Sequence, residues 1–234
     1  MPNNPSTVMD LLTSQQSLWI FGYGSLVWKP NFEFTSSKVG FVPGYSRKFW
    51  QGDTFHRGSP QMPGRVVTLQ EDYSECTWGI AYEVRGKQIE LSLEHLDVRE
   101  SVLGGYITKL VKFYPQDEGE EGAVLALVYI ATPQNPRYLG PASEEEIAAQ
   151  IVACSGCAGH NIEYLLRLAE FMHNCCPNAE DKHLFSIEEA LVACLSSAKM
   201  QILDKREIRV YKPRICLTVD LGQIPNTIIS ALTM

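Results

Sequence analysis

The amino-acid sequence predicts an α+β fold: a single domain with a closed or strongly curved sheet at its centre and a helical C-terminal part. Strand-like runs dominate residues 18–131, and one helical pattern interrupts them. After Thr132-Pro133-Gln134-Asn135-Pro136, whose two prolines exclude regular structure, apolar residues recur with helical spacing. A chain of 234 residues can bury one substantial core, so we expect one domain with extensions.

The expected strands are runs rich in β-branched and aromatic residues, bounded by Gly, Pro or Asp. Pro43-Gly44 and Pro63-Gly64 mark two of the turns between them. An acidic stretch at residues 115–122 is an expected exposed loop. The predicted strands cover residues 18–22, 39–50, 65–70, 76–84, 106–114 and 123–131.

Four helices are expected. Residues 87–98 place Ile89, Leu93 and Leu96 on one apolar stripe. Ser143 precedes three glutamates, which is typical of an N-cap followed by an acidic first turn, and this helix should end near Cys154. The third helix should begin at a capping Asn161, and the fourth should cover residues 181–197; the third carries Tyr164, Leu165, Leu168 and Phe171 on its apolar side.

Composition and charge predict three segments. Residues 1–17 are polar and are expected to be a flexible leader, residues 18–197 form the domain, and residues 198–234 form a tail of unknown role. That tail holds six Lys or Arg residues against three Asp or Glu. The chain as a whole has a net charge of −7, which argues against a nucleic-acid surface.

The sequence also predicts a location. Its apolar runs all fall short of the ~18 residues of a transmembrane helix, and its start lacks the basic and apolar regions of a signal peptide. The seven cysteines are an odd number and cluster late in the chain. Reduced thiols explain them more simply than a disulfide framework, so we expect a soluble, cytoplasmic protein with no membrane insertion.

The most informative motif is Gly22-Tyr23-Gly24-Ser25-Leu26, which directly follows the first strand. Glycines permit positive φ angles and let a ligand approach the backbone N–H groups, so this turn suits a small anion such as a carboxylate. The motif lacks the pattern of a Walker loop, of a dinucleotide fingerprint and of a nucleophile elbow. The pattern alone favours a tight turn that leaves a buried strand over any ligand site.

A second candidate is Glu100, at the end of the helix that leads through Gly104-Gly105 into the next strand. The negative pole of the helix and burial beside apolar neighbours would both raise the pKa of its carboxyl group, which suits general acid–base catalysis, whereas Arg99 would oppose that shift. The alternative is a solvated helix-end glutamate.

Several further segments occur in a fixed order with these two. The whole set is Gly22-Tyr23-Gly24-Ser25-Leu26, Tyr45-Ser46-Arg47-Lys48-Phe49-Trp50-Gln51-Gly52, His56-Arg57-Gly58, Pro63-Gly64-Arg65-Val66-Val67-Thr68-Leu69, Trp78-Gly79-Ile80-Ala81-Tyr82, Arg99-Glu100 with Gly104-Gly105-Tyr106, and Asn135-Pro136-Arg137-Tyr138-Leu139-Gly140-Pro141. Together these segments resemble the ChaC family of glutathione-specific γ-glutamylcyclotransferases over roughly residues 18–197. The stretch 99–106 and Tyr114-Pro115-Gln116-Asp117 are closer to the stress-induced vertebrate type than to the constitutive paralogue. The leader and the tail lie outside the resemblance.

The resemblance implies a small β-barrel flanked by helices and a reaction that needs no cofactor and no metal. In that reaction the α-amine of glutathione attacks its own γ-carbonyl, which releases 5-oxoproline and Cys-Gly. Glu100 would be the catalytic base and then the acid. The γ-glutamyl head group would be held by the strand end, namely Ile20, Phe21, Gly22, Tyr23, Gly24 and Ser25.

Other residues near these motifs have open roles. Backbone N–H groups of residues 22–25 would hold the α-carboxylate of the substrate and stabilise the oxyanion. The side chains of Tyr23 and Ser25 are candidates for additional hydrogen bonds. Arg57, Arg65 and Tyr106 either seat the substrate or serve a structural purpose.

Three alternatives stay open. A serine hydrolase would need Ser25 beside His56 or His160 and an acid. A zinc or redox site would draw on Cys154, Cys157, His160 and the pair Cys175-Cys176, although this spacing is not a standard ligand set. A binding module of the same fold would act through a protein partner, with the tail as its contact surface; the resemblance suggests stress, apoptosis, unfolded-protein-response and Notch signalling for that role.

Overall fold

The centre of the protein is a closed five-stranded β-barrel, as the sequence predicts. The structure is a computed structural model that describes residues 16–96, 106–117 and 122–208, with side chains as far as residue 197. The strands lie in the order β1-β3-β2-β4-β5, and a parallel pairing of β1 with β5 closes the ring. The strands are β1 (Ser17–Gly22), β2 (Ser36–Asp53), β3 (Gly64–Arg85), β4 (Ile107–Pro115) and β5 (Val124–Ile130).

One long strand, β3, replaces the two strands predicted at residues 65–70 and 76–84. Pro43 of β2 pairs with Cys76 and Tyr45 pairs with Glu71, so residues 72–75 lie opposite Gly44 alone. Gly44 has a φ of +81°, which few other residues adopt. The polar stretch that resembles a turn in the sequence is therefore a bulge in a continuous barrel strand.

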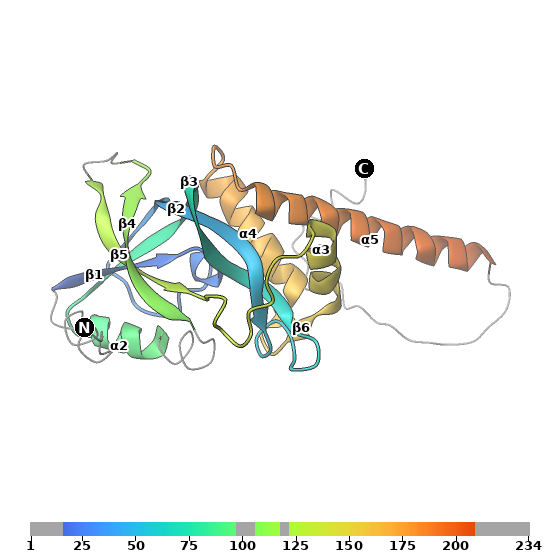
Figure 1. The fold of residues 1–234 in the computed structure, drawn as a ribbon, viewed down its shortest axis with the longest axis horizontal. Coiled ribbons are helices and arrows are strands. Elements are labelled where there is room, and N and C mark those ends of the chain that lie inside the picture. The colour runs from blue at the N-terminus through green and yellow to red at the C-terminus, as the bar shows by residue number, and fades with distance from the viewer. Residues whose placement is uncertain (1–15, 97–105, 118–121, 209–234) are drawn as a thin grey trace.

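Helices cover the barrel on two sides (Figure 1). On one side α2 (Lys87–Leu96) buries Ile89, Leu93 and Leu96 against β1, β3 and β5, which confirms the predicted stripe. On the other side lie α3 (Glu144–Ala153), α4 (Asn161–Cys175) and α5 (Lys182–Ile208). Helix α5 continues past residue 197, where we expected it to end, and reaches well beyond the body of the protein (Figure 1).

The ends of the helices follow the prediction at one position and depart from it at another. Ser143 and Glu146 form the expected capping box at the start of α3. Helix α4 is capped by His160, whose Nδ1 accepts a hydrogen bond from Ile162 N, and not by Asn161. The short strands β6 (Ser155–Gly156) and β7 (Gly159–His160), which the sequence did not predict, form the hairpin that places His160 there.

Asn161 is fully buried because it binds the backbone of β3. Its Oδ1 accepts from Arg65 N at 2.7 Å, and its Nδ2 donates to Arg65 O at 2.9 Å. The amide therefore meets a buried N–H and a buried C=O that would otherwise lack partners. This tertiary requirement overrides the preference of asparagine for a helix cap.

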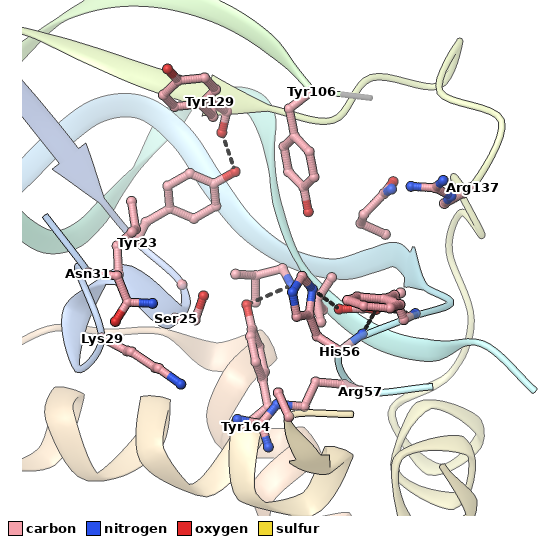
Figure 2. Close-up of a pocket in the computed structure, with 18 of the residues that line it drawn as sticks. Tyr23, Ser25, Lys29, Asn31, His56, Arg57, Tyr106, Tyr129, Arg137 and Tyr164 are labelled. Carbon is pink, nitrogen blue, oxygen red and sulfur yellow. Dashed lines mark hydrogen bonds and ion pairs between the residues drawn. The ribbon is translucent and has the colours of Figure 1, made fainter. Parts of the chain in front are cut away.

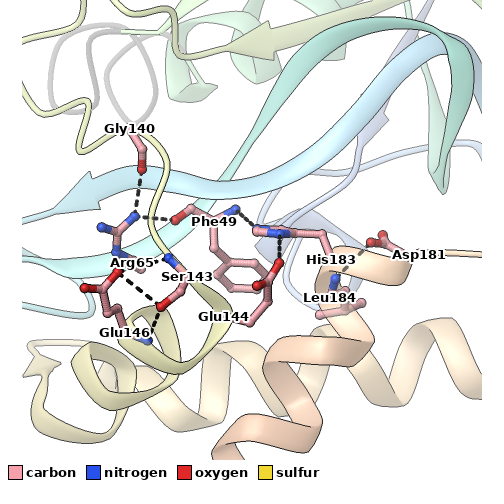
Figure 3. Close-up of polar contacts among 9 residues, drawn as sticks. All are labelled: Phe49, Arg65, Gly140, Ser143, Glu144, Glu146, Asp181, His183 and Leu184. Atoms are coloured by element: carbon pink, nitrogen blue, oxygen red, sulfur yellow. Dashed lines mark hydrogen bonds and ion pairs between the residues drawn. The ribbon is translucent and has the colours of Figure 1, made fainter.

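Two buried side chains attach the helices to the barrel (Figure 3). Arg65 Nη1 donates to Phe49 O at 2.9 Å and to Gly140 O at 3.0 Å, while its Nε donates to Gln150 Oε1 at 2.6 Å. His183 of α5 accepts a hydrogen bond from Phe49 N at 3.1 Å. Arg65 does not line the pocket that opens at the end of β1, so of its two predicted roles the structure supports the structural one.

Candidate active site

A pocket of about 960 Å³ opens at the end of β1 (Figure 2). Its volume is in the range of clefts that enclose small organic ligands. The turn after β1, the end of β2, the start of β3, helix α2 and helix α4 all contribute to it. The lining includes Phe21, Tyr23, Gly24, Ser25, Leu26, Lys29, Gln51, His56, Arg57, Val67, His95, Tyr106, Tyr129, Arg137 and Tyr164.

The turn itself is a short 3-10 helix, η1 (Ser25–Val27). Val27 N donates to Gly24 O at 3.0 Å, and Lys29 N donates to Ser25 O at 2.9 Å. Gly24 has a φ of −126°, and Gly22 is not among the glycines with positive φ. The expectation that these glycines supply a left-handed turn is therefore wrong.

Close packing is the reason for glycine at both positions. A Cβ atom at Gly24 would lie 2.7 Å from Tyr164 Oη and 2.8 Å from Val67 Cγ2. A Cβ atom at Gly22 would lie 2.6 Å from Leu26 Cβ. Helix α4 and strand β3 thus pack closely against the turn, and a side chain at Gly24 would displace them.

Two buried tyrosines anchor the turn to the barrel. Tyr23 Oη donates to Tyr129 O on β5 at 2.6 Å (Figure 2), and Tyr82 Oη on β3 donates to Leu26 O at 2.8 Å. Burial raises the pKa of Tyr82 to about 12, so this hydroxyl stays protonated and keeps donating. The backbone of the turn is consequently fixed before any ligand binds.

The structure brings four of the six predicted head-group residues to the pocket. Phe21, Tyr23, Gly24 and Ser25 line it. Ile20 does not, because the alternation of the strand turns its side chain into the core beneath α2. Gly22 is also absent from the lining and packs against η1 instead.

The predicted catalytic residue, Glu100, lies outside the described residues. The described chain nevertheless reaches the pocket on both sides of the gap that contains it. His95, in the last turn of α2, lines the pocket, and so does Tyr106, immediately before β4. Described residues on both sides of that gap, His95 and Tyr106, therefore lie at this pocket.

Arg57 and Tyr106, two candidates for seating the substrate, also line the pocket. The Arg57 guanidinium is already engaged: its Nη1 lies 2.7 Å from Glu163 Oε2 and 3.0 Å from His160 O. Burial and the nearby Arg57 charge lower the pKa of His160. These contacts fix the start of α4 beneath the pocket and favour a structural role for Arg57.

The geometry of Asp53, the carboxylate nearest to His56, does not support the serine-hydrolase alternative. His56 Nδ1 lies 3.7 Å from Asp53 Oδ2, beyond hydrogen-bond distance, while Asp53 Oδ1 accepts from the backbone N–H groups of Phe55 and His56. In Figure 2, Ser25 and His56 lie on different walls of the pocket. Asp53 thus stabilises the loop after β2 rather than orienting a histidine.

The cysteines of the zinc or redox alternative are dispersed. Cys154 is buried with its Sγ 3.3 Å from Pro63 O, while Cys157 is exposed. Burial raises the pKa of Cys176 to about 12, which makes that thiol inert. Within the described ranges, no three His, Cys, Asp or Glu side chains are grouped to hold a metal ion.

In the same ranges, no helix has the length and apolar character needed to cross a bilayer.

Sequence reasoning missed much of the pocket wall. It placed Tyr164 on the apolar side of a helix, yet the hydroxyl reaches the turn and accepts from Val67 N at 3.3 Å (Figure 2). Gln51 and Arg137 appear only as parts of longer motifs in the sequence. Their positions depend on pairing between distant segments, such as the 2.8 Å hydrogen bond from Gly52 N to Arg137 O, which local patterns do not encode.

Comparison with known proteins places this site in a family. The ChaC-like protein family matches residues 18–194. The chain is 65% identical over 180 residues to the glutathione-specific γ-glutamylcyclotransferase 1 of Rattus norvegicus, covering 77% of this chain and 81% of the relative. With the Homo sapiens protein of the same name it shares 60% identity over 199 residues, or 81% and 89% of the two chains.

A solved structure agrees with these sequence relatives. A γ-glutamyl cyclotransferase specific to glutathione from yeast superimposes with a TM-score of 0.69 at 27% identity, covering 76% of this chain and 96% of that chain. The chain belongs to the ChaC-like protein family.

Proposed function

We propose that this protein is a glutathione-specific γ-glutamylcyclotransferase, a carbon–nitrogen lyase that contributes to glutathione degradation. The observation that carries the proposal is the pocket at the turn after β1, which is also lined by His95 and Tyr106, residues on either side of Glu100 in the sequence. Its relatives at 60–66% identity carry that activity in their names. Lys29 and Arg137 give the pocket cationic groups in a chain with a net charge of −7, which suits a donor with two carboxylates.

The reaction joins two parts of one substrate. The α-amine attacks the γ-carbonyl carbon, a C–N bond of 5-oxoproline forms, and the C–N bond to the cysteine nitrogen breaks. The α-ammonium loses two protons and the leaving nitrogen gains two, so no external acid or base is consumed. The nucleophile belongs to the substrate itself. Folding the substrate into a near-attack geometry therefore lowers the activation free energy by several kcal/mol, on the order of the gain in intramolecular reactions.

The turn after β1 is the proposed support for the γ-glutamyl head. Ser25 and the half-buried backbone of Gly24 line one wall of the pocket, and the two tyrosine anchors hold the turn in place. We assign the proton transfers to Glu100, acting first as base towards the α-ammonium and then as acid towards the leaving nitrogen. Backbone N–H groups of the turn receive the α-carboxylate and the developing oxyanion.

The test is product formation from defined donors. Purified protein is incubated with reduced glutathione, and 5-oxoproline and Cys-Gly are quantified against γ-glutamyl-alanine as an alternative donor. We expect equimolar release from glutathione and far slower release from γ-glutamyl-alanine. Folded protein that releases 5-oxoproline from neither donor would refute the proposal, and equal rates with both would refute its specificity.

The cytosolic location is inferred from the reduced state that we expect for the cysteines. The signalling roles, in apoptosis, the unfolded protein response or Notch signalling, would require a protein partner, for which the tail at residues 198–234 is the proposed contact. Affinity capture with the full chain and with a chain ending at residue 197 tests this. A partner retained by both chains would exclude the tail.

A further inference from the structure

The pocket contains a buried hydrogen-bond acceptor that the protein leaves unused. Gln51, near the end of β2, lines the pocket and is 1% exposed. Its Nε2 donates to Gly52 O at 3.3 Å, which fixes the orientation of the amide because a carbonyl oxygen can only be met by a donor. Among the described residues, its Oε1 has no hydrogen-bond partner.

A buried acceptor without a partner destabilises the folded protein, so such a group at the wall of a pocket calls for a donor from outside the protein. Gln51 is held firmly where it stands. Its backbone pairs with Val66 on one side and bridges to Tyr138 on the other. The backbone position of Gln51 is therefore fixed, while the burial of the side chain and its hydrogen bond to Gly52 O restrain the amide.

The position of Gln51 indicates which part of a substrate it would meet. Val67, next to the strand partner of Gln51, is the residue that packs against Gly24. Gln51 is on β2, one strand further from the turn after β1 than Val67 is. Because neighbouring strands lie ~5 Å apart, the distance from the turn to Gln51 is roughly 8–10 Å. If the γ-glutamyl head of glutathione is held at that turn, its γ-carbonyl lies between the turn and Gln51. The second peptide bond of glutathione, the Cys–Gly bond, then lies beside Gln51.

The same wall is cationic. Arg137 lies across the pocket from Ser25 (Figure 2), and its backbone carbonyl accepts from Gly52 N, next to Gln51. None of the salt bridges among the described residues involves Arg137. A donor that extends from the turn past Gln51 thus ends with its terminal carboxylate near a positive charge.

We propose that Gln51 is a specificity-determining residue that accepts a hydrogen bond from the Cys–Gly peptide N–H of the donor. This inference rests on the proposed function and extends it to the leaving dipeptide. A site built to bind an N–H discriminates strongly against an analogue that lacks it, because the buried acceptor is then left without a partner. Gln51 in this role recognises the dipeptide half that distinguishes glutathione from shorter γ-glutamyl donors.

The experiment compares glutathione with its depsipeptide analogue, in which an ester oxygen replaces the Cys–Gly N–H. For the wild-type protein we expect kcat/KM to be ~10–100-fold lower with the depsipeptide. In Gln51→Met, a change of similar volume that removes the acceptor, kcat/KM for glutathione should fall and the ratio between the two donors should shrink by about tenfold. Gln70→Met makes the same change on β3 outside the pocket and should keep the wild-type ratio.

Three results would contradict the proposal or the proposed function. Equal use of both donors by the wild-type protein overturns the proposal without any variant, as does a Gln51→Met protein whose activity falls by the same factor with both donors. A wild-type protein that is inactive with glutathione and all other γ-glutamyl donors refutes the proposed function itself. Circular dichroism and the unfolding midpoint show that each variant is folded before rates are compared.

Discussion

Gly24 and Tyr164 are in contact across the edge of the pocket, so that a Cβ atom at Gly24 would lie 2.7 Å from Tyr164 Oη. The two residues are far apart in the sequence, one in the turn after β1 and the other on α4. Helix α4 therefore reaches the turn only because residue 24 has no side chain. This contact links the helical layer to the shape of the proposed head-group site.

Gly24→Ala should impair both stability and turnover. The added methyl group must push aside Tyr164 or Val67, and such overpacking costs ~1–3 kcal/mol of unfolding free energy. The displaced turn no longer holds the substrate in its reactive geometry, so kcat/KM with glutathione should fall by ~10–100-fold. Gly44→Ala is the control, since its positive φ makes it destabilising at a position outside the pocket. Activity lost equally in both variants would mean that stability alone is responsible.

Tyr23→Phe should loosen the turn. The substitution removes the donor to Tyr129 O and leaves a buried carbonyl without its partner, at a cost of ~1–3 kcal/mol. We expect a lower urea midpoint together with a higher KM for glutathione. Tyr73→Phe, which removes a hydroxyl from a residue that is 93% exposed, should change neither quantity. An unchanged midpoint in Tyr23→Phe would contradict the anchoring role of that hydroxyl.

Stability should fall in mild acid because of His183. Burial, helped by the Lys48 charge, lowers the pKa of His183 to about 4, although Asp181 and Glu144 act in the opposite direction. The unfolded chain, with a pKa near ~6.5, then binds a proton that the folded protein excludes, so stability present above pH ~6.5 is lost as the pH falls towards 4. Between pH 7 and pH 5 the loss from this group is at most ~2 kcal/mol.

The measurement is urea unfolding at several pH values for the wild-type protein and for His183→Gln. The glutamine side chain has an oxygen that can accept from Phe49 N, as His183 does (Figure 3), but it does not titrate. We expect the variant to be less stable at pH 7 and to lose less stability on acidification. Parallel pH curves for the two proteins would exclude His183 as the source of the effect.

Local patterns predict those parts of the fold that depend on local interactions. The stripe of Ile89, Leu93 and Leu96 and the Ser143 cap follow from helical spacing and capping chemistry. The single strand β3 was missed because its bulge opposite Gly44 exposes polar residues that look like a turn. Asn161 was misassigned because its hydrogen bonds are made with a residue 96 positions away.

The same distinction between local patterns and long-range contacts applies to the candidate site. Phe21, Tyr23, Gly24 and Ser25 form one continuous motif, and they were found from the sequence and line the pocket. The opposite wall combines single residues from β2, α4 and the segment after β5, which only the closed barrel brings together. The glycines were chosen correctly for the wrong reason, because close contact with Tyr164 and Val67, not a positive φ, requires them.

The most direct test of the account is the rate of 5-oxoproline release from glutathione by Glu100→Gln, compared with Glu90→Gln. Glutamine keeps the shape of the side chain and removes the proton transfer, so Glu100→Gln should lose at least ~10²–10⁴-fold in kcat and still be protected by glutathione against thermal unfolding. Glu90 is exposed on α2 away from the pocket, and its variant should match the wild-type rate. A Glu100→Gln protein with near-normal turnover would contradict the central claim that this carboxylate transfers the protons.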